Sequence, residues 1–322
     1  MSAAHSKLVV YAATAGNGLI AITKFIAAAY TGSSAMLSEA VHSVADTGNQ
    51  LLLLYGMHRA DQPPDELHPL GHGRELYFWS FIVALIMFTM GAGVALYEGI
   101  QHVLHPTPVS SPTVNYIVLG FAFVFEGASW AIALREFRRA KGTMGYYEAM
   151  RRSKDPVGFT VLFEDTAAML GLVIAFIGTL LAEHLDMPVL DGAASLAIAG
   201  VLGMTAIMLA RESKGLLIGE PASRAVRDSI LAIVNKTEGV DRGHITFTVH
   251  QAPDEVVVAL SLEFDDHMIA PEIERTFNAL EAAIHDAHPE VLALFVKPQT
   301  SAEHRANPYG RLDTDTEGSV VR

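Results

Sequence analysis

Six apolar segments decide what this chain can fold into. Each is long enough to cross the roughly 30 Å hydrocarbon core of a bilayer as a helix, and in lipid a helix satisfies its own backbone polar groups. Hydrophobic residues make up 51% of the 322 residues and charged ones 18%, which is typical of an integral membrane protein. The sequence therefore predicts an α-helical membrane protein with six transmembrane helices. The expected spans are residues 7–30, 36–57, 78–103, 114–136, 157–182 and 190–211.

Lys and Arg are distributed unevenly among the connections between these segments. The link 135–154 is rich in them, whereas the links 31–35, 104–113 and 183–189 contain none. By the positive-inside rule, the basic link and both termini face the cytosol. The first residues show neither a transit-peptide pattern nor a cleavable signal. We therefore expect a retained first span and, by default, a bacterial inner (plasma) membrane.

From about residue 215 the pattern changes from long apolar runs to that of a cytosolic α+β domain. The expected elements are a helix at 222–236, strands at 244–250 and 256–264, a helix at 271–285 and a strand at 291–296. The order αββαβ is that of a small ferredoxin-like domain. The predicted organisation is a six-helix transmembrane domain at 1–214, this cytosolic domain at 215–300, and a disordered acidic tail at 301–322.

Composition narrows the possible chemistry. The chain has no cysteine, so a metal must be held by His, Asp, Glu or carbonyl oxygen. Its formal net charge is −13, which argues against nucleic-acid binding, since that requires a basic face. Nothing in the sequence indicates a prosthetic group.

The second apolar segment contains a group of polar side chains. On a helix, His42 and Asp46 stand one above the other, with Glu39 and Asn49 on nearly the same face. An imidazole and a carboxylate at this spacing can share one divalent cation. The alternative is a hydrogen-bonded polar pair without a metal.

The fifth segment contains two adjacent carboxylates. Asp155 and Pro156 form a typical helix cap and first turn, and Glu164 and Asp165 follow well inside the apolar run, without a nearby Lys or Arg in sequence. If this helix packs against the second, the side chains of His42, Asp46, Glu164 and Asp165 make a site of nitrogen and oxygen ligands. Such a site suits zinc, with manganese or iron also possible. The alternative is a pair of protonated carboxyls bonded to neighbouring helices.

The loop between the second and third segments carries a third candidate group. Asp65, His68 and His72 follow one another at spacings of three and four residues, and Gly71 and Gly73 let the backbone bend around an ion. The alternative is that these side chains are simply solvated.

Three further charged residues lie within the spans. Glu98 is expected near the outer end of its helix. Lys24 and Glu126 are deeper, and they could pair with each other, pair with a carboxylate of the site, or carry protons.

Several short motifs resemble the cation diffusion facilitator family. They are NGLIAITK at Asn17–Lys24, TGSSA at Thr31–Ala35, EAVHSVAD at Glu39–Asp46 and HPLGHG at His68–Gly73, in the order and spacing of that family. LFEDTAA at Leu162–Ala168 resembles the branch that contains the ninth human zinc transporter.

The resemblance implies a homodimeric secondary transporter that exchanges a divalent metal, most often zinc, for protons. His42 and Asp46 match the family's second-helix ligands, and Asp165 matches one ligand on the fifth helix. The position of its partner is occupied by Val161, which cannot coordinate a metal, so Glu164 is the expected substitute. Asp65, His68 and His72 match the family's loop ligands.

Two other functions remain open at this point. Val161 favours a non-transporting membrane scaffold or partner subunit with the same fold. An intramembrane metalloenzyme would need an open ligand position and a separate general base, and no such motif is present, so we expect the chain not to be an enzyme.

Overall fold

The computed structural model describes residues 11, 14–23, 25–26, 29, 34–106 and 112–306, without the side chains of 34–42, 45, 112, 114, 115, 147, 151 and 152. The described chain divides into two compact units, residues 1–217 and 218–322. The regular elements described in the first unit are all helices, and the strands are in the second unit. Each unit is treated separately below.

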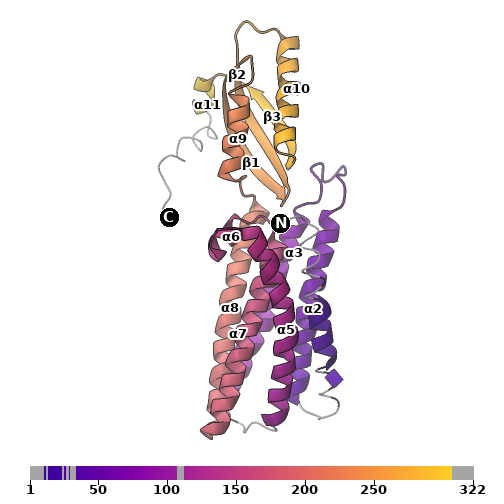
Figure 1. Ribbon diagram of the computed structural model, residues 1–322, viewed down its shortest axis with the longest axis vertical. Helices are drawn as coiled ribbons and strands as arrows, with labels where there is room; N and C mark the ends of the chain where they lie inside the picture. The colour runs from indigo at the N-terminus through magenta and orange to yellow at the C-terminus, as the bar shows by residue number, and fades with distance from the viewer. Residues whose placement is uncertain are drawn as a thin grey trace. The chain divides into compact units, whose positions relative to one another are not determined.

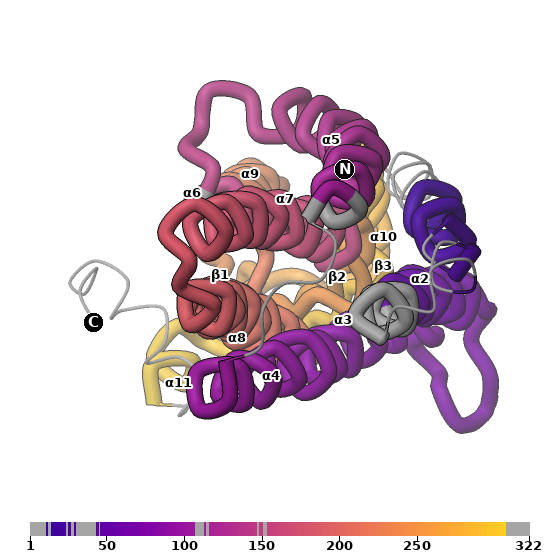
Figure 2. The backbone as a smooth tube through the Cα atoms, turned by 90° about the horizontal axis from the view of Figure 1, so that it is seen from below, coloured from indigo at the N-terminus to yellow at the C-terminus, as the bar shows by residue number. Residues whose placement is uncertain are grey.

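The long helices of the first unit run along a common axis (Figures 1 and 2). Residues 14–23 are helical, and the first expected span, 7–30, otherwise lies mostly outside the described residues. The remaining elements are α2 (Ser34–Ala60), α3 (Glu75–Ile86), the π-helix η1 (Met87–Ala92), α4 (Gly93–Leu104), α5 (Pro112–Lys141), α6 (Tyr146–Arg152), α7 (Pro156–His184) and α8 (Val189–Ile218).

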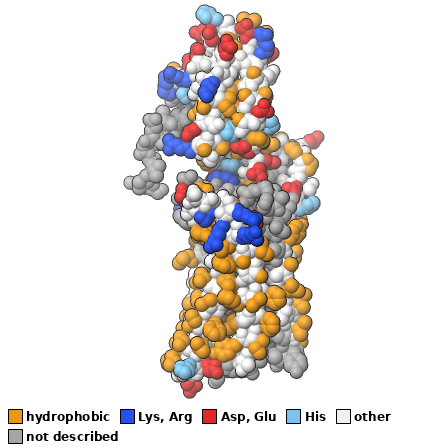
Figure 3. Space-filling view, viewed as in Figure 1, with side chains coloured by type: hydrophobic (Ala, Val, Ile, Leu, Met, Phe, Trp, Pro, Cys, Tyr) orange, Lys and Arg blue, Asp and Glu red, His pale blue; other side chains and the backbone are white. Residues whose placement is uncertain are grey.

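Four helical stretches within the described residues are long and apolar enough to cross a membrane: Glu75–Leu104, Tyr116–Lys141, Pro156–His184 and Val189–Ile218. They coincide with the third to sixth expected spans. Hydrophobic side chains cover most of the visible flank of this unit, and Lys and Arg gather at the end where α5 ends (Figure 3). The chain is thus a helical protein of the membrane type, and the full set of six spans stays a prediction.

The third expected span differs from a regular helix. The six residues of η1 interrupt it between α3 and α4, and the N–H of Gly93 bonds to the carbonyl of Phe88, five residues back. A π-turn accommodates one residue more than an α-turn and is frequent at functional sites. The short helix α6 was also not expected from the sequence.

Helix α7 begins as expected from its first two residues. The Asp155 carboxylate accepts hydrogen bonds from the backbone N–H groups of Val157 (3.1 Å) and Gly158 (3.3 Å). Pro156 occupies the first turn, where a missing N–H costs nothing. This cap fixes the start of the helix that carries Glu164 and Asp165.

The second unit has the expected element order, followed by one additional helix. It comprises α9 (Arg224–Val234), β1 (Val240–Ala252), β2 (Glu255–Phe264), α10 (Ala270–Ala287), β3 (Val291–Pro298) and α11 (Ser301–Ala306). The strands form one sheet in the order β1-β2-β3. The β1–β2 pair is antiparallel, with Thr248 opposite Val258, and β2–β3 is parallel, with Val258 opposite Leu294.

One face of this sheet packs against α9 and α10 (Figure 1). Alternate residues of β2, such as Leu260 and Leu262, are buried against Ile230 of α9 and Leu280 of α10. Burying each such side chain contributes about 1.5–3 kcal/mol. The core of this unit is therefore formed by apolar residues that alternate along the strand and by apolar residues that recur every 3.6 positions on the two helices.

The segment predicted to be a disordered tail begins with ordered structure. Ser301 and His304 of α11 are buried, and the Ser301 hydroxyl and N–H donate to the Glu263 carboxylate. The prediction of disorder is therefore wrong for residues 301–306, because contacts with the sheet outweigh their polar composition. Residues 307–322 lie outside the described residues.

Candidate metal sites

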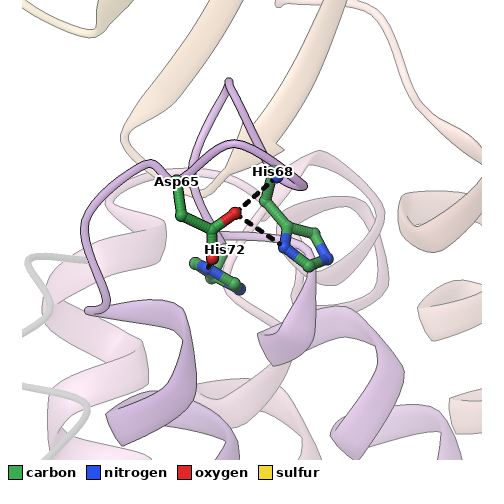
Figure 4. Close-up of side chains that lie close together, drawn as sticks. All are labelled: Asp65, His68 and His72. Atoms are coloured by element: carbon green, nitrogen blue, oxygen red, sulfur yellow. Dashed lines mark hydrogen bonds and ion pairs between the residues drawn. The ribbon is translucent and has the colours of Figure 1, made fainter.

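The loop between α2 and α3 brings Asp65, His68 and His72 together (Figure 4). One oxygen of Asp65 accepts the backbone N–H groups of Leu67 (2.9 Å) and His68 (2.6 Å), which folds the loop back on itself. Gly71 has a φ of 83°, a left-handed conformation that glycine adopts without strain. This turn places His72 beside the same carboxylate.

Both imidazoles point to Asp65. His68 Nδ1 lies 3.2 Å from Asp65 Oδ1, and His72 Nε2 lies 3.1 Å from Asp65 Oδ2. One ligand atom from each of the three residues lies within 4.8 Å of the others. In a tetrahedral zinc site, ligand atoms are roughly 3.4 Å apart, so a small contraction would let the three atoms share one ion.

The electrostatics of the loop favour a cation. The backbone N–H of His68 has the largest effect on the pKa of Asp65, and burial opposes it. The side chains of His72 and His68 and the N–H of Leu67 add to the first effect, so that the pKa falls from 3.8 to about 2. Asp65 is therefore ionised at any physiological pH and available as a ligand. His72 is buried, whereas Asp65 and His68 are exposed, so the site is anchored on one side and open on the other.

A second cluster lies inside the helical bundle of the first unit. Carboxylates from α2, α5 and α7 line one cavity of about 30 Å³, which is room for one ion or one or two waters. The π-helix η1 forms another part of its wall. The lining residues are Asn17, Asp46, Asn49, Ile86, Met87, Met90, Gly91, Glu126, Glu164, Asp165, Ala168 and Leu202.

The two adjacent carboxylates of α7 reach different neighbouring helices. Asn49 Nδ2 of α2 donates to Glu164 Oε1 at 3.1 Å, and Ser129 Oγ of α5 donates to Asp165 Oδ2 at 2.9 Å. Adjacent helical residues point about 100° apart, so the two side chains can reach α2 and α5 in different directions. Both side chains are buried and both line the cavity.

Three of the predicted membrane ligands line one cavity, although among the described residues only Asp65, His68 and His72 have ligand atoms within 4.8 Å of one another. Asp46, Glu164 and Asp165 share the cavity, whereas the side chain of His42 and the whole of Lys24 lie outside the described residues. Val161 is fully buried in the hydrophobic core and is not among the described residues that line the cavity.

Sequence reasoning missed two polar residues of this site. Ser129 bonds to Asp165, and Asn17 both lines the cavity and donates to Gln50 Oε1 at 3.1 Å. The spacing of Ser129 from Glu126, three residues on one helix face, is a signal that could have indicated the first. Asn17 begins the NGLIAITK motif, but no spacing to another polar residue indicated that its side chain lines the site.

Comparisons with known proteins identify the family of the helical part of the chain. The model of the cation efflux transmembrane domain matches residues 10–218. The chain belongs to the cation diffusion facilitator family.

Within that family it is related to a zinc antiporter branch. It is 40% identical over 214 residues to the human "Proton-coupled zinc antiporter SLC30A9, mitochondrial", an alignment that covers 66% of this chain and 38% of the human protein. Metal tolerance protein C4 of Arabidopsis thaliana is 32% identical over 239 residues, covering 74% and 52%. The cation-efflux pump FieF of Escherichia fergusonii is 26% identical over 291 residues, covering 85% and 90%. The chain thus spans about two fifths of the length of the human relative.

Proposed function

We propose that this protein is a secondary transporter that exports a divalent metal cation, with zinc as the main substrate, from the cytosol in exchange for protons. The observation that carries the proposal is the buried cavity shared by Asp46, Glu164 and Asp165. Ionisable groups inside a membrane span are costly and mark ion pathways. The names of the antiporter and efflux relatives support the same function.

The coupling to protons follows from the chemistry of the ligands. Carboxylates and imidazoles bind a metal only when they are deprotonated, so metal and protons compete for the same groups. If the cavity opens in turn to each side of the membrane, protons entering from outside displace the metal outward. In this mechanism Asp46, Glu164 and Asp165 hold the ion, His42 completes the set, and Ser129 and Asn49 orient the two α7 carboxylates.

The loop site has a different role in this proposal. Asp65, His68 and His72 form an open-sided group at the end of α2, where they would bind the metal on the cytosolic side before or after its passage. Manganese, iron(II) and cobalt are the other candidate substrates, since the ligands are all nitrogen and oxygen.

The remaining parts of the proposal concern assembly and location. They are six spans, a homodimer, both termini in the cytosol and a bacterial inner membrane, with a transmembrane domain at 1–214 and a cytosolic domain at 215–300. The orientation rests on the Lys and Arg at the end of α5 and the positive-inside rule. Because several relatives are named as mitochondrial, accessibility labelling of each terminus in intact cells and in organelles is the required test.

The function is tested by metal uptake into proteoliposomes with an imposed pH gradient. We expect uptake by the intact chain and none by Asp46→Ala or Asp165→Ala, with Glu98→Ala as a matched control, since Glu98 is exposed on α4 and is not a lining residue. Loss of flux in Glu164→Ala would make Glu164 a ligand, whereas retained flux would leave it a structural role. Flux that is indifferent to the pH gradient would refute proton exchange.

A non-transporting scaffold is the second candidate. It is favoured by Val161, an apolar core residue at a position where family members have a ligand. In that case the intact chain moves no metal, and Asp46→Ala retains whatever partner binding the intact chain has.

A further inference from the structure

Helix α5 has a buried side and an exposed apolar side. The buried side includes Ala122, Ser129, Ala133 and Phe137. On the opposite side, Ile117, Phe121 and Val124 are exposed, and they follow one another at spacings of four and three residues, so they form one stripe along the helix. Exposed apolar patches of this kind mark a surface that contacts lipid.

Two arginines continue this stripe at the end of the span. Val124 and Arg135 are about three helical turns apart, so their side chains point in nearly the same direction. Arg138 follows Arg135 by one turn, and both side chains are exposed. The rise from Ile117 to Arg135 is about 27 Å, close to the roughly 30 Å hydrocarbon core of a bilayer. The two guanidinium groups therefore lie at the level of the lipid headgroups.

The segment around these arginines is strongly basic. Residues 135–154 contain seven Lys and Arg against two Glu, in a chain whose formal net charge is −13. Figure 3 shows Lys and Arg gathered at this end of the bundle. One of the two acids, Glu136, is buried and lies 2.9 Å from Arg139 Nη1. The excess of positive charge favours an anion and disfavours a headgroup that carries its own cation.

Contacts between α5 and α6 hold Arg138 in place without cancelling its charge. Arg138 Nε donates to the hydroxyl of Tyr146 at 2.8 Å, and that oxygen is neutral. The Tyr146 ring stacks on Phe137, with centroids 6.1 Å apart, and Lys141 Nζ lies 4.9 Å from its centroid. Tyr146 is also exposed, as is common for tyrosines at the membrane–water interface.

We propose that Arg135 and Arg138 bind the phosphate of an anionic phospholipid. A guanidinium donates paired hydrogen bonds to a phosphate, and side chains three residues apart on a helix are neighbours, with Cβ atoms about 5–6 Å apart. In the proposed orientation the lipid belongs to the cytosolic leaflet. The inference depends on the membrane location of the helices and not on transport, so its failure would leave the proposed function standing.

The test is native mass spectrometry of the full chain in detergent, titrated with phosphatidylglycerol or with phosphatidylcholine of the same acyl chains. We expect tighter binding of phosphatidylglycerol. Each positive side chain near an anionic lipid surface contributes roughly fivefold in affinity. Arg135→Gln should therefore weaken phosphatidylglycerol binding about fivefold, and the double variant with Arg138→Gln about 25-fold, with little change for phosphatidylcholine.

Two variants serve as controls. Arg211→Gln removes another exposed positive charge, near the end of α8, and should leave the affinity for phosphatidylglycerol nearly unchanged. Arg135→Lys keeps the charge but loses the planar fork of donors, so its affinity should lie between those of the intact chain and Arg135→Gln. Melting temperatures should be similar for all variants, because the substituted side chains are exposed.

Other results would overturn the inference. Equal affinity for the two lipids, or an equal loss in Arg211→Gln, would reduce the effect to the overall charge of the protein. Displacement of the lipid by free glycerol phosphate would indicate a site for soluble phosphates. A change in the mass of the protein assembly without a change in bound lipid would assign this face of α5 to contact between two copies of the chain.

Discussion

The hydrogen bond between Asn49 and Glu164 is the contact through which α2 fixes the unusual carboxylate of α7. Asn49 Nδ2 lies 3.1 Å from Glu164 Oε1, and both side chains are buried. Replacing Asn49 by Leu keeps the number and branching of the side-chain heavy atoms but removes the donor. We expect zinc binding at the membrane site to weaken while the helices remain folded.

The size of this effect follows from the chemistry of the bond. A hydrogen bond to a charged group contributes about 1.5–3 kcal/mol, and about 1.4 kcal/mol corresponds to a factor of ten in affinity. Without the donor, Glu164 must be held in its binding orientation by the metal alone. The Asn49→Leu variant should therefore bind zinc about 10- to 100-fold more weakly, which agrees with the usual cost of losing a partner that orients a ligand.

The assay is a zinc titration of purified protein at pH 7 on a background in which Asp65→Ala disables the loop site. Thr47→Ala is the matched control, because the Thr47 hydroxyl bonds within α2, to the carbonyl of Ser43. Unchanged zinc affinity in Asn49→Leu would refute the reasoning, since it would mean that Glu164 needs no support from α2 or does not bind the metal.

Four further predictions concern the loop, the second unit and the π-helix. Asp65→Asn should weaken zinc binding at the loop by at least the roughly tenfold typical of disturbed metal sites, and Glu66→Gln should not. The pKa of Asp65 is lowered from 3.8 to about 2, so its carboxylate stays ionised when the pH falls from 7 to 5. Any loss of metal over that range, measured by titration, should therefore come from protonation of other groups. Gly243→Ala places a methyl group against Val234 and should destabilise the second unit by about 1–3 kcal/mol, seen as a lower melting temperature. Deleting Thr89, an exposed residue of η1, should restore a regular helix and abolish metal uptake without unfolding the protein, whereas Thr89→Ala should preserve uptake.

The regular elements were largely predictable because their signals are local. The length of an apolar run is itself the requirement for crossing a bilayer, and Asp155-Pro156 marks the first turn of α7 through the hydrogen bonds that only this turn needs. The strands of the second unit follow from alternation. These patterns depend on one segment at a time, and the structure has them close to where the sequence predicts them.

The features that were not predicted depend on contacts between segments. Helix α11 is short and polar, and it is ordered through the burial of His304 and the bonds from Ser301 to Glu263. The π-turn of η1 adds one residue to a helical turn without changing its apolar character, so hydropathy carries no trace of it. Neither the sequence nor its periodicity specifies these partners.

The Glu164 carboxylate of α7 is accommodated in the bundle by polar side chains of the neighbouring helices. Helix α2 is not among the strongly apolar helices of the described residues, in part because it carries Asp46, Asn49 and Gln50. Its polar face is what makes a carboxylate at Glu164 tolerable, because Asn49 supplies a donor on the side of α7 that faces α2. Val161 lies in the core, and the adjacent side chains of Glu164 and Asp165 reach α2 and α5 in two different directions. On this argument, the identity of residue 49 and that of residue 164 are coupled, and a change at either should be corrected only by a change at the other.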